Sequence, residues 1–350
     1  FAADFKFRKP TNKELAVLVG IVGDAVLFIL FFNGGWWEFC RARFFRHMLF
    51  SKDEINKEVK RMKLADRRGN IEECSSGQDR LLEWIYTHET GRFLMKGLIN
   101  PHISEIGAVF LDSRASRVLI AWFIRKNKIP MYQYEQKKYR SFNEFFKRKA
   151  LPGARRIIRE PERLISPCDG RLSVYKIEEN SRFQIKHTSY STESLLKNEG
   201  LAKRYAGGYA WVFRLCVEDY HRYIYVDDGV KSENVKIPGV LHTVNPVAND
   251  SFPIYKENAR EFSLLCSENF GTVLMMEVGA MMVGKIENRH QAARVRRGQE
   301  KGNFAFGGST IILLTQKGKA MPDPDIWENS LNGIETKVRL GESVGRGKKR

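Results

Sequence analysis

The stretch Gly302–Leu314 constrains the fold more strongly than any other, because two glycines stand directly before a serine and an apolar, β-branched run follows. Short apolar runs on both sides of the glycines are typical of two β-strands. Gly307 and Gly308 let the backbone between these strands adopt φ values that other residues avoid. We therefore expect a sharp, exposed bend that presents Ser309.

Two interpretations of this bend are open. In the first, the glycines form a turn between two core strands and Ser309 only caps it. In the second, the Ser309 hydroxyl attacks the Gly308 carbonyl, the amide becomes an ester, and β-elimination leaves a dehydroalanine that hydrolyses to a pyruvoyl group. Glycine suits the acyl side because it has no Cβ to obstruct the hydroxyl. Since a hydroxyl is a weak nucleophile without a base, this interpretation requires a histidine and a carboxylate elsewhere.

The composition predicts a folded protein that is attracted to polyanions. Its 350 residues include 43% hydrophobic side chains, enough for one large domain or two smaller ones, and the formal net charge is +18. The sequence has no zinc-finger spacing, no aromatic RNA-binding strand signature and no helix-turn-helix pattern. We therefore expect an anionic membrane surface as a partner, and no nucleic acid.

The cysteines indicate a reducing compartment. They are odd in number, widely spaced and without a Cys-x-x-Cys pair, which argues against a disulfide framework and against a structural zinc site. We expect most of them to be simple buried thiols. The five are Cys40, Cys74, Cys168, Cys216 and Cys266.

The N-terminal part carries the features of a membrane anchor. Leu15–Phe32 is almost wholly apolar, interrupted by Asp24 and two glycines, and its length approaches the roughly 20 residues that cross a bilayer. Trp36 and Trp37 follow where interfacial aromatic residues would hold such a helix. We expect a membrane span or deep anchor; a buried or signal-type helix is the alternative. Ser51–Ser76 is strongly charged and predicts a solvated helix and a linker.

Two segments with apolar and basic residues at helical spacing follow, Arg80–Asn100 and Glu105–Lys128, and prolines mark their ends. These helices either pack their apolar faces on a core or lie on a membrane interface. A further short helix is predicted to begin after Ser141, because Glu144 completes a capping-box pattern, and to end at Pro152–Gly153.

The residue composition and pattern of the sequence change near residue 150. Beyond it, short runs rich in Val, Ile, Phe and Tyr alternate with Gly, Pro, Asn and Asp, which is typical of a β-rich domain. The predicted fold class is α+β. We expect three regions: an N-terminal anchor and charged linker (1–79), a helical membrane-associating region (80–150) and a β-rich domain that holds the chemistry (151–350).

Three clusters in the β-rich region carry residues that the pyruvoyl interpretation needs. Asp169 lies in the turn Ser166–Gly170, His221 lies beside acidic and aromatic neighbours, and His242 lies between turn signals. Each cluster alone is ordinary, because Pro-x-Asp-Gly sequences form structural turns and most single histidines are not catalysts. They are informative because they occur together with Ser309.

The motifs of this region, in order, are Ser-Pro-Cys-Asp-Gly, Asp-Tyr-His-Arg-Tyr, Pro-Gly-Val-Leu-His-Thr-Val-Asn-Pro, Glu-Val-Gly-Ala-Met-Met-Val-Gly and Phe-Gly-Gly-Ser-Thr. The set resembles the pyruvoyl-dependent phosphatidylserine decarboxylases, in their Gly-Gly-Ser-Thr subgroup. The resemblance runs from about Thr90 to Gly345 and includes Phe142–Phe146. Five motifs in the same order argue against coincidence.

The resemblance implies a proenzyme that cleaves itself between Gly308 and Ser309, giving a β fragment and an α fragment that begins with a pyruvoyl group made from Ser309. Asp169 would orient and charge-stabilise the histidine that removes the serine proton. The pyruvoyl carbonyl would form a Schiff base with phosphatidylserine and accept the electrons released as CO2 leaves, which gives phosphatidylethanolamine. Neither a metal nor pyridoxal phosphate is implied. The α fragment would supply internal strands, so the two fragments would stay together in a membrane-associated enzyme.

One position departs from the family pattern. Many members have a second histidine three residues after the position of His221, where this chain has Ile224, which cannot accept a proton. We therefore assign the base for self-cleavage to His221 or His242. His221 is also a candidate for the proton donor in decarboxylation.

Two other functions remain open. Asp169, His221 and Ser309 are the residue types of a serine hydrolase, although the Gly-x-Ser-x-Gly sequence is missing. A membrane-anchored lipid-binding protein without activity is the other alternative. The sequence also leaves open whether the chain forms a homo-oligomer.

Overall fold

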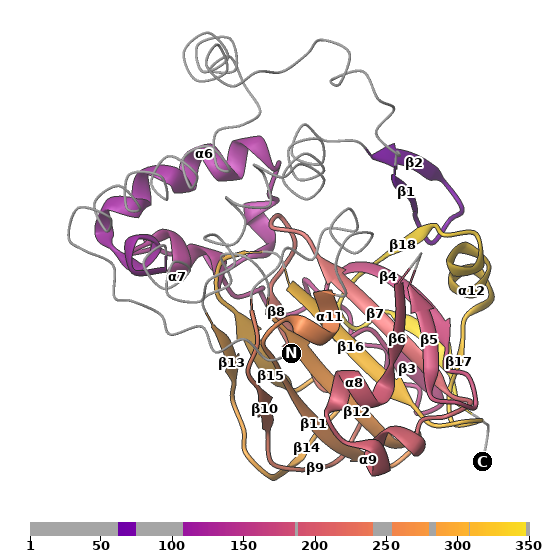
Figure 1. Ribbon diagram of the computed structural model, residues 1–350. Coiled ribbons are helices and arrows are strands. Elements are labelled where there is room, and N and C mark those ends of the chain that lie inside the picture. Colours follow the sequence, from indigo (N-terminus) through magenta and orange to yellow (C-terminus); the bar gives the residue numbers. More distant parts are fainter. Residues whose placement is uncertain are drawn as a thin grey trace, which may run out of the picture. The chain divides into compact units, whose positions relative to one another are not determined.

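A computed structural model of the chain describes residues 62–74, 108–185, 188–240, 254–279, 285–307 and 309–347 (Figure 1). All of these residues belong to one compact unit. The expected membrane segment Leu15–Phe32, His242 and Gly308 lie outside the described residues. None of the helices that the structure describes has the length and apolar character needed to cross a bilayer.

The largest element of the fold is a mixed sheet of 11 strands in the order β14-β9-β11-β12-β16-β7-β4-β18-β1-β2, with β10 paired to β11. Its strand pairs are antiparallel, apart from the parallel pair of β1 with β18. The strands are β1 (Met62–Ala65), β2 (Ile71–Cys74), β4 (Gly170–Lys176), β7 (Tyr209–Leu215), β9 (Gly229–Lys231), β10 (Val235–Ile237), β11 (Arg260–Ser267), β12 (Gly271–Val278), β14 (Ala293–Val295), β16 (Ser309–Thr315) and β18 (Glu335–Val338).

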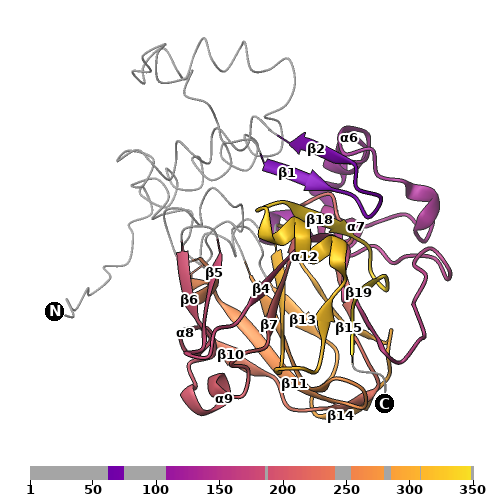
Figure 2. The same ribbon diagram turned by 90° about the vertical axis from the view of Figure 1, so that its right-hand side faces the viewer.

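Smaller sheets accompany the large one, in the orders β13-β15-β8, β17-β19-β3 and β5-β6. Their strands are β3 (Arg163–Ile165), β5 (Arg182–Ile185), β6 (Thr188–Ser191), β8 (Arg222–Ile224), β13 (Ile286–Asn288), β15 (Glu300–Phe304), β17 (Met321–Pro322) and β19 (Ser343–Arg346). The helices are η1 (Arg114–Arg117), α6 (Val118–Lys126), η2 (Met131–Gln133), α7 (Phe142–Phe146), α8 (Thr192–Leu196), α9 (Glu199–Lys203), α11 (Ile254–Glu257) and α12 (Pro324–Leu331). Helix α12 packs against β4 and β18 (Figure 2).

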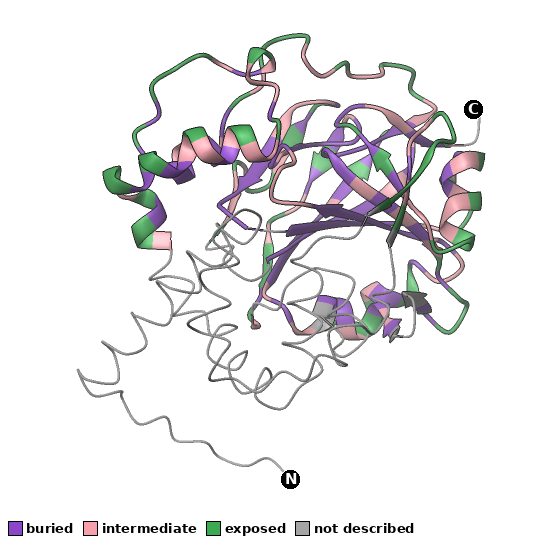
Figure 3. Cartoon of the chain, turned by 90° about the horizontal axis from the view of Figure 1, so that it is seen from above, coloured by how far each residue is buried: buried purple, intermediate pink, exposed green. Residues whose placement is uncertain are grey.

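Strand β16 lies inside the large sheet, between β12 and β7 (Figure 1). Ser309 pairs with Leu215 at the end of β7, and Thr310 pairs with Val278 at the end of β12. All seven residues of β16 are buried, and Figure 3 shows the neighbouring strands largely in the colour of buried residues. A strand covered on both faces requires a continuous apolar run, which explains the sequence Ile311–Leu314.

The described residues confirm a mixture of helices and strands whose C-terminal part is β-rich. The division near residue 150 stays a prediction. The internal position of β16 agrees with the expectation that the segment after Gly308 contributes an internal strand.

The prediction of a solvated helix and linker was wrong for residues 62–74, which form the antiparallel hairpin β1–β2. The turn is local: the Asp66 carboxylate accepts hydrogen bonds from the backbone N–H groups of Arg68 and Asn70, and Gly69 has φ 88°. Strand β1 then extends the large sheet by pairing with β18. The charged residues obscured this because the hairpin lies at the end of the sheet, where its side chains face solvent.

The helix predicted after Ser141 is confirmed at its start and was wrong at its end. Ser141 accepts a hydrogen bond from the Glu144 backbone N–H at 3.1 Å, but α7 ends at Phe146 instead of reaching Pro152–Gly153. It is held by aromatic packing, because Phe123 of α6 contacts Phe142 with ring centroids 5.1 Å apart. The buried face of α6 therefore packs on α7, which is the core-packing alternative, while Val118 of the same helix is exposed.

Candidate functional site

Ser309 is the first residue of β16, and it is buried. The expectation of an exposed bend was wrong, because the strand begins at the serine and is flanked by β7 and β12 from its first residues. The need for glycine before it is confirmed at Gly307, whose φ is 138°. The Ser309 Oγ has no hydrogen-bond partner among the described residues. A buried hydroxyl without a partner costs free energy, so its position calls for an explanation.

His221 lies at the end of the turn that connects β7 to β8. The turn is closed by a hydrogen bond from the Asp219 N–H to the Cys216 carbonyl at 2.9 Å. The Nδ1 of His221 lies 3.0 Å from the Asp219 carbonyl oxygen. Because a carbonyl can only accept, Nδ1 donates in this contact, and a neutral imidazole in this tautomer keeps its lone pair on Nε2. Nε2 has no hydrogen-bond partner in the described part of the chain.

The environment of His221 keeps its imidazole neutral. The ring is fully buried and packs on Phe146, with centroids 4.3 Å apart. Burial lowers the pKa of His221 to about 3; the backbone of Asp219 opposes the shift, the positive charge of Arg148 adds to it, and the backbone of Gly307 opposes it. The influence of Gly307 places the imidazole beside the residue that precedes Gly308.

Arg148 supports the turn that carries His221. Its Nη2 donates to the carbonyls of Glu218 and Asp219 at 3.2 and 3.3 Å, and its guanidinium stacks on Tyr134. The same Asp219 carbonyl accepts from His221. Arg148 thus fixes the group that sets the tautomer of the histidine. Sequence reasoning missed this residue, because the carbonyls that it contacts lie about seventy positions further along the chain.

Asp169 occupies the predicted turn between β3 and β4, but its carboxylate faces Arg155. The Arg155 Nε donates to Oδ1 at 2.9 Å and Nη2 donates to Oδ2 at 2.6 Å, while the Leu340 N–H also donates to Oδ1. Among the described residues, Asp169 makes no hydrogen bond to a histidine. Whether it pairs with His242 lies outside what the structure describes. Arg155 is a second residue that sequence reasoning missed.

Helix α7 contacts the segment that leads to Gly308. The Phe306 N–H donates to Oδ1 of Asn143 at 3.0 Å, and Nδ2 of the same amide donates to Asp112 at 2.9 Å. The Phe306 ring also packs against Phe142 and Phe146 at 5.1 Å each. The capping pattern identified this helix, but its role in holding Phe306 became evident only in three dimensions.

A buried ionic cluster lies on the neighbouring strands. Lys301 of β15 donates to Glu277 of β12 at 2.7 Å, and both side chains are fully buried. Asn288 accepts from Lys301 and donates to Glu277. Burial raises the pKa of Glu277, against the lowering effect of Lys301. Glu277 belongs to the fourth sequence motif and pairs with Ile311 of β16, so the cluster borders the strand of Ser309.

Cys168, Cys216 and Cys266 are free thiols, and the first two are poor nucleophiles. Burial raises the pKa of Cys168, and it raises the pKa of Cys216 to about 12. Cys168 is buried, as expected for most of the thiols, Cys216 is half-buried and Cys266 is exposed. Ser309 and His221, which the sequence singles out, each have a buried polar atom without a described partner, and no hydrogen bond joins these two side chains.

The chain was then compared with known proteins. The family model for phosphatidylserine decarboxylase matches residues 142–346. A phosphatidylserine decarboxylase proenzyme 2 from Clostridium acetobutylicum is 44% identical over 265 residues, covering 75% of this chain and 91% of the relative. This chain belongs to the phosphatidylserine decarboxylase family. Proenzymes from Ruminiclostridium cellulolyticum and Clostridium novyi are both 42% identical, covering 79% and 76% of this chain and 93% and 92% of the relatives.

The family membership confirms the resemblance, whereas the Gly-Gly-Ser-Thr subgroup stays a prediction. Ile224, the residue at which the sequence departs from the expected pattern, is buried in β8. Its N–H donates to the Pro167 carbonyl, in the Ser-Pro-Cys-Asp-Gly turn, at 2.9 Å. The position therefore connects β8 to the turn of Asp169 through the backbone alone.

Proposed function

We propose that this chain is a phosphatidylserine decarboxylase proenzyme that cleaves itself between Gly308 and Ser309. The observation that carries the proposal is the buried Ser309 Oγ, without a partner among the described residues, at the start of an internal strand in a chain of this family. The three relatives above are named as decarboxylase proenzymes. They give no support to a serine hydrolase or to a non-catalytic lipid-binding protein.

In the proposed cleavage, a histidine takes the proton of Ser309 as Oγ bonds to the Gly308 carbonyl carbon. The peptide C–N bond breaks, the amine regains a proton and an ester remains. Elimination across Cα–Cβ of Ser309 then releases the Gly308 carboxylate. Hydrolysis of the remaining enamine releases ammonia and leaves the pyruvoyl ketone. Glycine at 308 has no Cβ that would obstruct the approach of Oγ to its carbonyl carbon. Gly307 also lacks a Cβ, which allows its positive φ.

The base is proposed to be His221 or His242. His221 is supported by its lone pair on Nε2, which has no described partner, beside Gly307. Its burial disfavours a full positive charge, so a nearby carboxylate would have to stabilise the imidazolium. Asp169 is proposed for that role with His242, since its carboxylate bonds to Arg155 and the Leu340 N–H and makes no hydrogen bond to His221.

The pyruvoyl group made from Ser309 would supply an electron-accepting carbonyl for the loss of CO2 from phosphatidylserine. The chain's own contribution includes the aromatic side chains around His221. Phe146 and Phe304 cover His221, and Phe306 lies in the approach to Gly308. His221 is the candidate donor of the proton that replaces CO2.

Membrane association is proposed because phosphatidylserine resides in a bilayer. Support comes from apolar side chains near η1 and α6, with Val109 71% and Val118 78% exposed. Arg114 and Arg117 lie between them in the sequence and are exposed. Apolar side chains beside basic ones are the pattern of an interfacial surface on an anionic membrane.

The proposal is tested on freshly purified protein by a denaturing gel with intact mass measurement. We expect two fragments, of which the smaller begins with a pyruvoyl group that borohydride reduces, and CO2 release from phosphatidylserine. Ser309→Ala should stay full-length, while Ser263→Ala, which changes another buried serine of the large sheet, should be cleaved. An unbroken wild-type chain without a reducible carbonyl would rule out the decarboxylase.

The choice of base is tested by His221→Asn and His242→Asn in parallel. The variant that accumulates full-length precursor identifies the base. If His242→Asn stays uncleaved while His221→Asn is cleaved but releases no CO2, then His242 is the base and His221 acts in decarboxylation. Normal cleavage in both variants would refute both assignments.

A further inference from the structure

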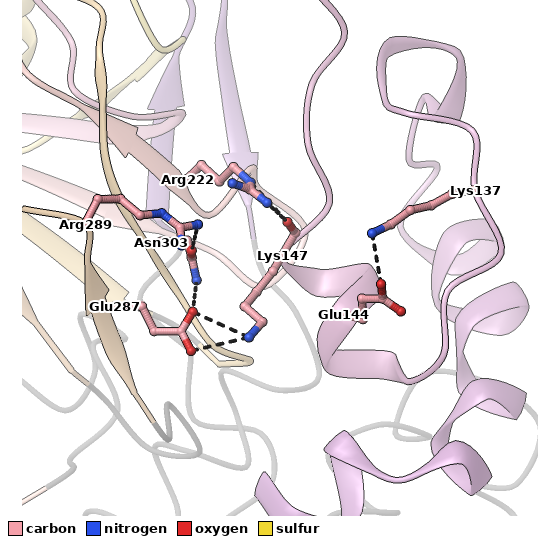
Figure 4. A pocket seen from close by; sticks show the side chains of 7 residues that line it. All are labelled: Lys137, Glu144, Lys147, Arg222, Glu287, Arg289 and Asn303. Carbon is pink, nitrogen blue, oxygen red and sulfur yellow. Dashed lines mark hydrogen bonds and ion pairs between the residues drawn. The ribbon is translucent and has the colours of Figure 1, made fainter.

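A hollow of about 210 Å³ lies between α7 and the small sheet β13-β15-β8 (Figure 4). Its lining comes from one residue of α7, from the segments directly before and after that helix, from each strand of that sheet, and from the residue that follows β13. The charged members are the cations Lys137, Lys147, Arg222 and Arg289 and the carboxylates Glu144 and Glu287.

The size and lining of this hollow restrict what it can hold. Pockets for drug-sized ligands measure roughly 300–1,000 Å³, so this one suits an ion or a headgroup. Its described lining contains no apolar side chain, which excludes an acyl chain or a hydrophobic ligand. Four cations against two carboxylates leave a surplus of two positive charges in the lining. Glu300, which is not part of the lining, pairs with Arg222 and Arg289 and offsets part of this positive charge.

Two of the cations have hydrogen-bonding capacity to spare. The Lys147 Nζ lies 3.3 and 3.4 Å from the two Glu287 oxygens, longer than the roughly 2.7–2.9 Å of a strong charge-assisted bond. Arg289 donates Nε to Glu300 and Nη2 to Asn303, but its Nη1 donates to no described residue. Its side chain is 44% exposed, so the pairing with Glu300 is weak.

The other two cations have different roles. Arg222 uses all three of its nitrogens on Glu300 and on the carbonyls of Lys147 and Arg148, so it builds the wall of the hollow. Lys137 pairs with Glu144 on the rim and is 46% exposed. An exposed pair of this kind costs little to rearrange when a ligand enters.

The hollow is separate from the proposed reaction centre. Asn303 is paired with Arg222 on one side and with Glu287 on the other, so these three side chains share one face of the small sheet. His221 and Phe304 are the chain neighbours of Arg222 and Asn303 and therefore face the opposite side. Contact between the His221 and Phe304 rings agrees with this placement.

We propose that the hollow binds a phosphate-type anion through Lys147 and Arg289, with Lys137 at the rim. Arginine offers a planar fork and lysine a point charge, and both are standard donors to phosphate oxygens. The anion is either free phosphate or the phosphodiester of a lipid headgroup. The inference goes beyond the proposed decarboxylase activity and does not depend on it.

The test is a calorimetric titration of the full chain with inorganic phosphate at constant ionic strength. We expect saturable binding that weakens at least about tenfold in Lys147→Gln/Arg289→Gln, because each substitution removes a charge-assisted hydrogen bond to the anion. Lys149→Gln/Arg294→Gln is the matched control, because it removes the same charge from side chains that are 58% and 79% exposed outside the hollow. The two single variants should each show a smaller loss.

Vesicles distinguish the two sources of phosphate. If the occupant is a lipid headgroup, the double variant should also bind vesicles of phosphatidylcholine with phosphatidylglycerol more weakly than the control variant does. If the occupant is free phosphate, only the calorimetric affinity should fall. Absence of saturable phosphate binding, or equal affinity in double variant and control, would overturn the inference. A gel on the same samples shows self-cleavage, so failure here is distinguishable from failure of the proposed function.

Discussion

His221 combines complete burial with a single backbone partner, the Asp219 carbonyl. Such a residue couples the stability of the fold to pH, because the buried imidazole resists the proton that the unfolded chain accepts. The direction of this pH dependence follows from the two pKa values of His221, which are about 6.5 in an unfolded chain and about 3 in this fold.

We therefore predict a pH-dependent difference between wild type and His221→Phe. Below about pH 6.5 the unfolded wild type binds a proton that the folded protein does not, so its stability falls as pH decreases towards 3. The free energy of unfolding of wild type relative to the variant should fall by about 1.4 kcal/mol per pH unit. Urea unfolding of both proteins at several pH values measures this difference in the free energy of unfolding. Groups that titrate alike in both proteins make no contribution to the difference. A constant difference between pH 7 and pH 5 would contradict the prediction.

Lys301→Met should be strongly destabilising. It leaves the Glu277 carboxylate buried without its 2.7 Å partner, and breaking a buried pair costs about 3–5 kcal/mol. Lys301→Met/Glu277→Gln should lose less than the two single variants together, because no charge remains unpaired. The loss in Lys301→Met should also be smaller at low pH, where a buried carboxyl becomes neutral. Urea unfolding measures the double-mutant cycle, and additive losses would argue against a coupled pair.

At this scale, the sequence allowed Ser309, His221 and Asp169 to be predicted because each stands in a motif with turn residues. It did not allow Arg148 and Arg155 to be predicted, because arginines among 59 Lys and Arg residues carry no individual signal. Which carbonyl or carboxylate an arginine meets depends on strand pairing. Two glycines before Ser309 indicate a turn, but they do not indicate whether the turn lies inside or outside the sheet.

Helix α7 joins three parts of the fold, since its residues pack on α6, stack on His221 and hold Phe306. Five residues would not form a stable isolated helix, so its stability comes from this packing. The element therefore transmits the arrangement of α6 to the segment before Gly308.

Asn143→Ala tests this role. It leaves the buried Phe306 N–H without an acceptor, which should cost about 1–3 kcal/mol in stability. It should also slow the appearance of cleaved fragments on a gel, because Phe306 is no longer held. Asn127→Ala, which removes an amide that bonds only to Phe123 at the end of α6, is the control and should cost less. Equal effects of the two changes would show that α7 does not position this segment.

Elements with a buried face were the most predictable ones. Strands β7 and β16 could be predicted from the sequence because apolar residues are required on both of their faces. The β1–β2 hairpin could not be predicted from the sequence, because Ile71 is 54% exposed and the charged side chains around it face water. Its strand character comes from pairing with β18, which lies more than 260 residues away in the sequence.

At the scale of the whole molecule, the two products of the proposed cleavage share one sheet. Strand β16 pairs along its length with β7, and β18 pairs with β4. We predict that the fragments co-elute in gel filtration without denaturant and separate only in urea, with a single unfolding transition for both. Fluorescence and fragment-specific mass measurement follow the transition. Separation of the fragments under native conditions would contradict this arrangement.

The location of Ser309 also determines the order in which synthesis, folding and the proposed cleavage can occur. The strands that flank β16 are β7 and β12, and both precede it in the sequence. The chain must therefore leave the ribosome through β16 before these three strands can pair around the serine. If cleavage requires that pairing, incomplete or misfolded chains stay without a ketone, and the protein acquires its reactive group only once these strands are in place.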